Sequence, residues 1–158
     1  MKKIKEIQCQ WYNCNKQIKD LLMTKNQTIR EQLEAYIEKK YKLHEEQLPF
    51  NHEDYAVFRQ PSGKWFAVFF VKPYSEFGLG GDKTVDVVSF KIRDHELTET
   101  LYEQPGYIKG YPNSGWGWVS ALLDGTVPFE DLCRWLDESY NATLHEPGNM
   151  NIPLEKRK

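Results

Sequence analysis

Long hydrophobic runs are missing from this sequence of 158 residues. The longest one, residues 65–71, has seven residues, whereas a helix needs about 20 to cross a bilayer, which excludes a transmembrane helix. No apolar segment follows the basic start of the chain, so a signal peptide is not expected either. These two absences favour a cytoplasmic protein with no membrane partner.

Cysteine is also scarce, with Cys9, Cys14 and Cys133 as the only examples. Their odd number, without a C-x-x-C pair, argues against a zinc site and against a disulfide framework. The four histidines form no i, i+4 pair, and none lies beside a serine or cysteine in a known nucleophile setting. We therefore expect no metal, no cofactor and no catalytic residue.

Two stretches still have to be weighed as ligand sites. The glycine-rich loop 78–84 lacks the adjacent Gly-Lys-Thr of a phosphate-binding loop, because Asp82 separates Gly81 from Lys83 and a strand pattern follows. We interpret it as a strand connection. The polar cluster His52-Glu53-Asp54 leaves a small-molecule or metal site open, although a solvated loop is the simpler interpretation.

The composition is that of one folded, soluble domain, with 40% apolar, 28% charged and 14% aromatic residues. The net charge of −2 is distributed unevenly: residues 1–27 carry +4, residues 28–146 carry −8, and residues 147–158 carry +2. A body of −8 repels nucleic acid unless its few cations gather on one face.

Helical patterns occur in four places. Residues 2–23 have an apolar stripe and predict an N-terminal helix, extra to the main domain. A second helix starts at Thr28, which forms a capping box with Glu31. Its apolar face consists of Ile29, Leu33, Tyr36, Ile37 and Tyr41. Asp94 caps a short third helix, and Pro128 lies in the first turn of a fourth.

Five runs rich in aromatic and β-branched residues alternate with these helices and predict strands. They are residues 55–59, 65–71, 85–91, 107–111 and 117–123. Short links with proline and glycine join the first two runs and the last two, which is typical of hairpins. The order predicts a two-layer α+β domain over residues 28–146, α-β(3)-α-β(2)-α with an antiparallel sheet. The tail 147–158 is expected to be disordered.

The most unusual stretch is residues 109–118, where turn-forming residues alternate with aromatic residues and one lysine. Trp118 begins an apolar strand and is expected in the core. Trp116 at the tip, together with Tyr111, is a candidate for stacking on a base or for packing against a partner protein.

Eight segments have an order and spacing that point to a known family. They are Ala56-Val57-Phe58-Arg59, Lys64-Trp65-Phe66-Ala67, Asp86-Val87-Val88-Ser89-Phe90-Lys91, Glu103-Gln104-Pro105-Gly106, Gly110-Tyr111, Trp118-Val119-Ser120, Leu123-Asp124-Gly125-Thr126-Val127-Pro128 and Leu136-Asp137-Glu138-Ser139-Tyr140. Together they resemble the MmcQ/YjbR family over residues 28–143.

The resemblance implies an α-β(3)-α-β(2)-α fold, similar to that of secretion chaperones, and DNA binding through a double wing of two hairpin loops, with no enzyme activity. Carried over, residues 60–64 form the first wing and residues 112–117 form the second wing. The implied contacts, which supply charge and stacking, are Arg59, Lys64, Lys109 and Trp116. In the second wing, Gly115 stands where the family commonly has a lysine.

Two functional hypotheses follow. The first is a non-enzymatic protein that binds DNA weakly, in a salt-dependent way, through the two wings. The alternative is a protein-interaction module that uses the chaperone-like fold and the aromatic residues of the second wing and binds no nucleic acid.

Overall fold

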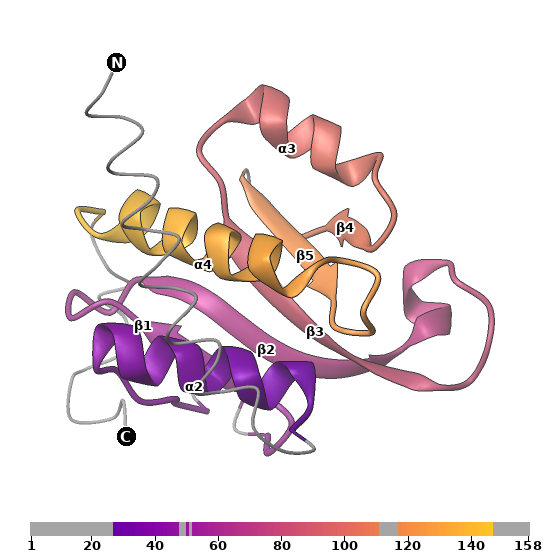
Figure 1. Cartoon of the computed structure of the whole chain (residues 1–158), viewed down its shortest axis with the longest axis horizontal. Helices are drawn as coiled ribbons and strands as arrows, with labels where there is room; N and C mark the ends of the chain where they lie inside the picture. The colour runs from indigo at the N-terminus through magenta and orange to yellow at the C-terminus, as the bar shows by residue number, and fades with distance from the viewer. Residues whose placement is uncertain (1–26, 48–49, 51, 111–116, 147–158) are drawn as a thin grey trace.

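The computed structural model describes residues 27–47, 50, 52–110 and 117–146 (Figure 1). Across these residues the predicted order of helices and strands is confirmed. The elements are α2 (Ile29–Tyr41), β1 (Ala56–Arg59), β2 (Trp65–Pro73), the 3-10 helix η1 (Tyr74–Phe77), β3 (Thr84–Lys91), α3 (His95–Tyr102), β4 (Tyr107–Lys109), β5 (Trp118–Leu122) and α4 (Phe129–Thr143). The N-terminal helix predicted over residues 2–23 and the tail 147–158 lie outside the described residues.

The helices begin largely where their capping residues predict. The hydroxyl of Thr28 accepts a hydrogen bond from the backbone N–H of Glu31 at 3.1 Å. The carboxylate of Asp94 accepts one from the N–H of Leu97, also at 3.1 Å. Pro128 differs from its prediction, because it is the residue before α4 and keeps an extended ψ of 140°.

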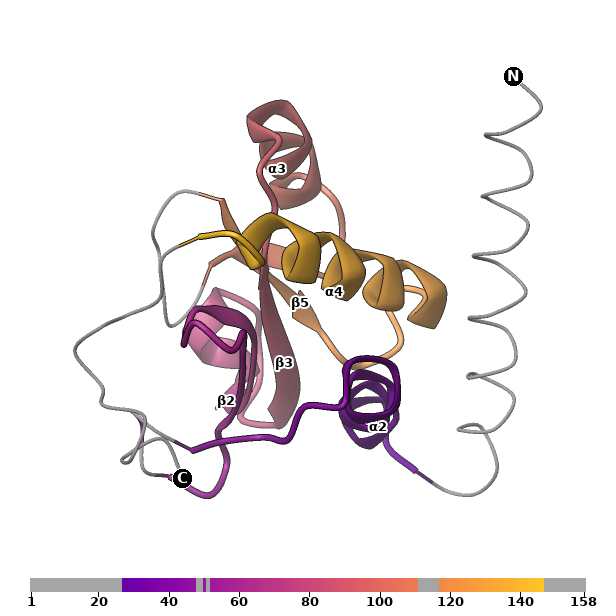
Figure 2. The ribbon, with the colours of Figure 1, turned by 90° about the vertical axis from the view of Figure 1, so that its left-hand side faces the viewer.

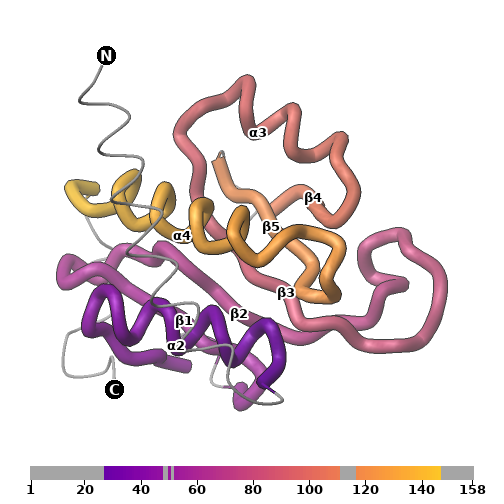
Figure 3. The backbone as a smooth tube through the Cα atoms, viewed as in Figure 1, coloured from indigo at the N-terminus to yellow at the C-terminus, as the bar shows by residue number. Residues whose placement is uncertain are grey.

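The five strands form one antiparallel sheet in the order β1-β2-β3-β5-β4. After β3 the chain passes through α3 and returns along β4, and β5 then fits between β3 and β4 (Figure 3). The strand β2 is apolar on both faces because it lies inside the sheet, paired with β1 and β3.

All three described helices contribute to a large apolar cluster on one face of the sheet, and Figure 2 shows α2 and α4 on the same side of β2 and β3. Fully buried members include Tyr36 of α2, Phe69 of β2, Phe90 of β3 and Leu136 of α4. Trp118 is buried as expected, at 4% exposure. Within the described residues, no helix combines the length and the apolar character needed to span a bilayer.

The opposite face of the sheet carries a smaller apolar cluster with Val57, Phe70 and Val87 at its centre. Part of its cover comes from η1, whose residues Tyr74 and Phe77 pack against it. The sequence patterns predicted a strand connection over residues 78–84 and no helix before it, so the 3-10 turn, which is only four residues long, was not predicted.

Candidate functional site

Strand pairing brings the first wing and the two described flanks of the second wing to one end of the sheet, which we call the wing end. The first wing closes this end because Arg59, the last residue of β1, pairs with Trp65, the first residue of β2. Next to it, Lys91 at the end of β3 pairs with Trp118 at the start of β5. The N–H of Gly110 donates to the carbonyl oxygen of Trp118 at 3.0 Å, so the described residues on both sides of the second wing lie at this end too.

The last turn of α4 is anchored at the wing end, and Figure 1 shows it on the same side as the link between β1 and β2. The side-chain amide of Gln60, in the first wing, donates to the carbonyl oxygen of Tyr140 at 2.8 Å and to the hydroxyl of Thr143 at 3.2 Å. Beyond β3, the Arg93 guanidinium donates to the carbonyl oxygen of Ala142 at 2.6 Å. A cation at a helix C-terminus is also favoured by the helix dipole.

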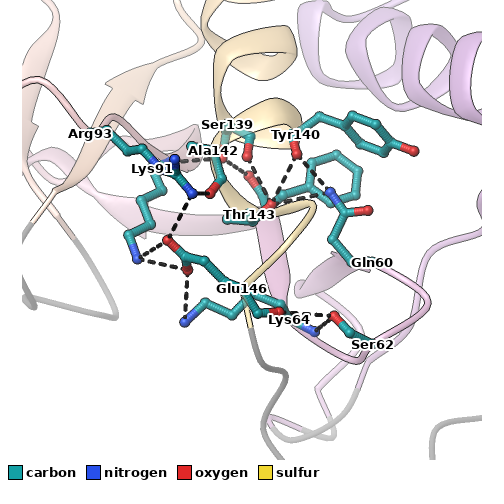
Figure 4. A network of polar contacts seen from close by, with 11 residues as sticks. Gln60, Ser62, Lys64, Lys91, Arg93, Ser139, Tyr140, Ala142, Thr143 and Glu146 are labelled. Atoms are coloured by element: carbon teal, nitrogen blue, oxygen red, sulfur yellow. Dashed lines mark hydrogen bonds and ion pairs between the residues drawn. The ribbon is translucent and has the colours of Figure 1, made fainter.

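Three cations meet one carboxylate here, and we call this group the Glu146 cluster (Figure 4). The Lys91 ammonium donates to both carboxylate oxygens of Glu146, at 3.1 and 3.0 Å. The Lys64 ammonium lies 3.2 Å from the same carboxylate, and the Arg93 guanidinium 3.8 Å from it. The cluster therefore carries a net charge of +2, inside a domain whose overall charge is negative.

Partial burial strengthens these ionic contacts, because less water screens the charges. The side chain of Lys91 is 12% exposed and that of Lys64 is 29% exposed, whereas Arg93 is 60% exposed. Burial alone raises the pKa of Glu146, but hydrogen bonds from Lys91 and Lys64 outweigh it, so this pKa lies below its usual range. Glu146 is therefore ionised at neutral pH and neutralises one of the three cations.

Arg59 takes a structural position. Its side chain is 4% exposed, and its guanidinium lies 2.7 Å from the carboxylate of Glu46. The same group donates to the carbonyl oxygen of Gly63 at 3.1 Å and lies over the Trp65 ring at 5.4 Å. Arg59 thus fixes the turn of the first wing, and its charge is already paired.

The other two predicted contact residues, Lys109 and Trp116, lie outside the Glu146 cluster or outside the described residues. Lys109 is exposed on the edge strand β4, and no described carboxylate lies within ion-pair distance of its ammonium. Trp116 and the tip of the second wing lie outside the described residues, so its stacking role stays a prediction. Lys91 and Arg93 were missed as candidates, although their place at the end of the strand between the two hairpins was the available signal.

The cluster His52-Glu53-Asp54 does not form a compact site. The His52 imidazole accepts the backbone N–H of Asp54 at 3.1 Å and lies 3.6 Å from its carboxylate, and both side chains are more than half exposed. Across the described residues, no three histidine, cysteine, aspartate or glutamate side chains are grouped so that they could hold a metal ion.

Several known proteins are similar to this chain. The uncharacterized protein YyaQ of Bacillus subtilis is 23% identical over 115 residues, which cover 72% of this chain and 97% of YyaQ. A crystal structure of a Pseudomonas syringae protein has a TM-score of 0.68 at 31% identity and covers 72% of this chain and 97% of its own. A solution NMR structure from the same organism has a TM-score of 0.65 at 30% identity and covers 77% and 98%.

A third solved structure, from Deinococcus radiodurans and described as a DUF419 domain, has a TM-score of 0.52 at 25% identity. It covers 79% of this chain and 84% of its own. The sequence model of the YjbR family matches residues 39–142, a stretch that contains all five strands, α3 and most of α4. With two thirds of its length inside that match and the same arrangement of helices and sheet as its solved relatives, the chain belongs to the YjbR family.

Proposed function

We propose that the wing end binds the phosphate backbone of DNA in the cytoplasm, weakly and without catalysis. The observation that supports this proposal is the gathering of Lys64, Lys91, Arg93 and Lys109 at one end of the sheet, beside both wings. In a domain with a net charge of −8, such a local excess of cations attracts a polyanion that the rest of the surface repels.

Each cation has a distinct place in this interface. Lys64 projects from the first wing and Lys109 flanks the second, while Lys91 and Arg93 lie between them at the end of β3. Arg59 shapes the first wing and makes no phosphate contact in this proposal, because its side chain is only 4% exposed and its guanidinium is enclosed by Glu46, the carbonyl oxygen of Gly63 and the Trp65 ring. Contacts of this kind set affinity and orientation and carry no base sequence. Stacking by Trp116 adds affinity without sequence preference.

The salt dependence of binding tests the proposal directly. Three or four phosphate contacts predict a slope of about −3 for the logarithm of the association constant against the logarithm of salt concentration. Fluorescence anisotropy with a labelled 20-base-pair duplex, starting near 50 mM salt, measures this slope. The absence of binding at tens of micromolar protein under those conditions would refute the proposal.

Single charge removals locate the interface. Arg93→Gln and Lys109→Gln should each weaken binding to all duplex sequences alike and reduce the salt slope by about 1. Lys83→Gln is the matched control, because it removes the same charge from an exposed lysine just before β3, at the opposite end of the sheet. An equal effect of Lys83→Gln would show that only the overall charge matters.

The second candidate is a protein-interaction module, favoured by the net charge of −8 over residues 28–146. In that case the aromatic residues of the second wing contact a protein. Trp116→Ala should then abolish capture of the partner while circular dichroism and thermal unfolding stay unchanged. DNA binding with a steep salt slope would count against this candidate.

A further inference from the structure

Glu146 holds a position in which a larger anion would be better paired. Its one carboxylate faces cations from three separate segments: Lys64 in the first wing, Lys91 at the end of β3 and Arg93 beyond it (Figure 4). Two positive charges stay uncompensated within the Glu146 cluster. Asp94, which follows Arg93 directly in the sequence, accepts the N–H of Leu97 and so caps α3.

The backbones of Lys64 and Lys91 are held by the framework, independently of Glu146, and the Arg93 guanidinium has a second acceptor in the carbonyl oxygen of Ala142. The backbone N–H of Lys91 donates to the Ser139 hydroxyl at 2.8 Å, and that hydroxyl donates to the carbonyl oxygen of Phe66 at 2.5 Å, which joins α4 to the sheet. The carbonyl oxygen of Lys64 accepts the N–H of Gln60 at 2.8 Å inside the first wing. The backbones that carry the cations therefore need no carboxylate to keep them in place.

Glu146 itself is held more loosely. It lies three residues beyond the end of α4, and its backbone has a hydrogen bond of 3.1 Å to the carbonyl oxygen of Thr143 and a long one of 3.5 Å from the Ser62 hydroxyl. Its main attachment is thus the ionic contact of its side chain with the three cations, and a competing anion can take that contact over.

We propose that Lys64, Lys91 and Arg93 form a binding site for a phosphate group, which Glu146 occupies until a phosphate displaces it. An inorganic or terminal phosphate offers more acceptor oxygens than a carboxylate to the same donors and carries up to twice its charge, whereas a single phosphodiester of DNA equals a carboxylate in charge. The Lys91 ammonium, largely removed from water, needs a counterion in either state. The proposal deepens the proposed function, since Glu146 then competes with the DNA backbone for the central cations of the wing end.

Glu146→Gln tests the competition, because it removes the charge and retains the size of the side chain. It should raise the affinity for inorganic pyrophosphate and the affinity for the labelled duplex by about fivefold each, the effect of one charge at about 4 Å in water. The shift of the thermal unfolding transition measures pyrophosphate binding, and fluorescence anisotropy measures duplex binding. Glu138→Gln, the same change on an exposed position of α4, should alter either affinity less than twofold. The double variant Glu146→Gln/Lys91→Gln should lose the gain.

Comparing pyrophosphate with duplex DNA as ligands distinguishes a failure of the Glu146 proposal from a failure of the proposed DNA binding. Tighter pyrophosphate binding by Glu146→Gln, with no duplex binding by any form, would keep the phosphate site and refute DNA as its source. Duplex binding by the wild type, with no more gain in Glu146→Gln than in Glu138→Gln, would overturn the competition and leave the proposed function intact. If Glu146→Gln does not fold, Glu146→Asp, which draws the carboxylate back by one methylene, should show a smaller gain, and no gain would overturn the proposal.

Discussion

At the scale of single residues, the most heavily bonded acid of the core is Asp137 of α4. Its carboxylate accepts hydrogen bonds from the Tyr36 hydroxyl at 2.9 and 3.1 Å, from the Lys40 ammonium at 3.0 Å and from the Tyr41 hydroxyl. All three donors belong to α2. This polar contact ties the two helices together on the same face of the sheet, with Tyr41 also stacked on Tyr140 at 3.8 Å.

The tyrosines of this contact are held in their neutral form. Burial raises the pKa of Tyr36 and of Tyr41, and the negative charge of Asp137 raises both further. In the unfolded chain the same hydroxyls ionise near pH 10. Their stabilising effect is therefore complete below about pH 10 and is lost as the pH rises, because the unfolded state then releases protons that the folded state retains.

Replacing Tyr36 by phenylalanine should lower stability at neutral pH and weaken its dependence on alkaline pH. We expect a loss of about 1–2 kcal/mol at pH 7, since one buried acceptor loses a donor. Above pH 10, the wild type should lose about 1.4 kcal/mol per pH unit more than the variant does. Urea unfolding between pH 7 and pH 11 measures both.

Tyr74→Phe serves as the control at neutral pH, because its hydroxyl bonds Asp124 in an exposed position at 2.8 Å, and it should cost less than about 0.5 kcal/mol. Parallel curves for wild type and Tyr36→Phe above pH 10 would contradict the assignment.

The sequence placed Tyr36 and Tyr41 on the apolar face of their helix correctly. It gave no sign of Asp137, because that contact depends on how α2 and α4 pack.

At the scale of elements, the wing end depends on a close approach of backbone at Gly117. This glycine has φ of +87°, and its carbonyl oxygen accepts the N–H of Ile92 at 2.8 Å. A Cβ atom at this position would lie 2.8 Å from the carbonyl oxygen of Ile92. Only glycine satisfies both conditions, because a side chain would be strained and would also press on backbone.

Gly117→Ala should therefore lower the free energy of unfolding by about 2–3 kcal/mol, which combines positive-φ strain with the displaced backbone. Chemical denaturation measures the loss. Gly80→Ala is the control, since nothing lies within 4 Å of an added Cβ and its φ is not positive, and it should stay within about 0.5 kcal/mol of the wild type. Equal effects would mean that Gly117 is not constrained by Ile92.

Local patterns predicted the order of helices and strands, the hairpin links and the caps at Thr28 and Asp94, because each depends on residues close in sequence. The positions of the cations at the wing end were predicted in part. Lys64 and Lys109 follow from the hairpins themselves. The roles of Lys91 and Glu146 did not follow, because they require β5 to pair with β3 and the end of α4 to reach the first wing.

At the scale of the whole molecule, the two apolar clusters of the described residues extend over most of the described chain. Among the residues that the structure describes, both clusters have their buried members between Leu33 and Leu136. We predict that removing residues 1–27 leaves a cooperatively unfolding domain whose melting temperature changes by less than about 4 °C, equivalent to about 1 kcal/mol for a chain of this size. Differential scanning calorimetry of the shortened and full chains measures this. Loss of the cooperative transition would make residues 1–27 part of the folding unit.

The position of β5 between β3 and β4 has a consequence for co-translational folding. One edge of the apolar strand β3 receives its partner only after the stretch from Lys91 to Trp118 has been synthesised. Until then the nascent chain carries an open β edge, which is the kind of template on which chains aggregate. We therefore expect slow translation across this stretch to lower the fraction of newly made protein that reaches its native sheet, and a chaperone that covers the open edge to raise it.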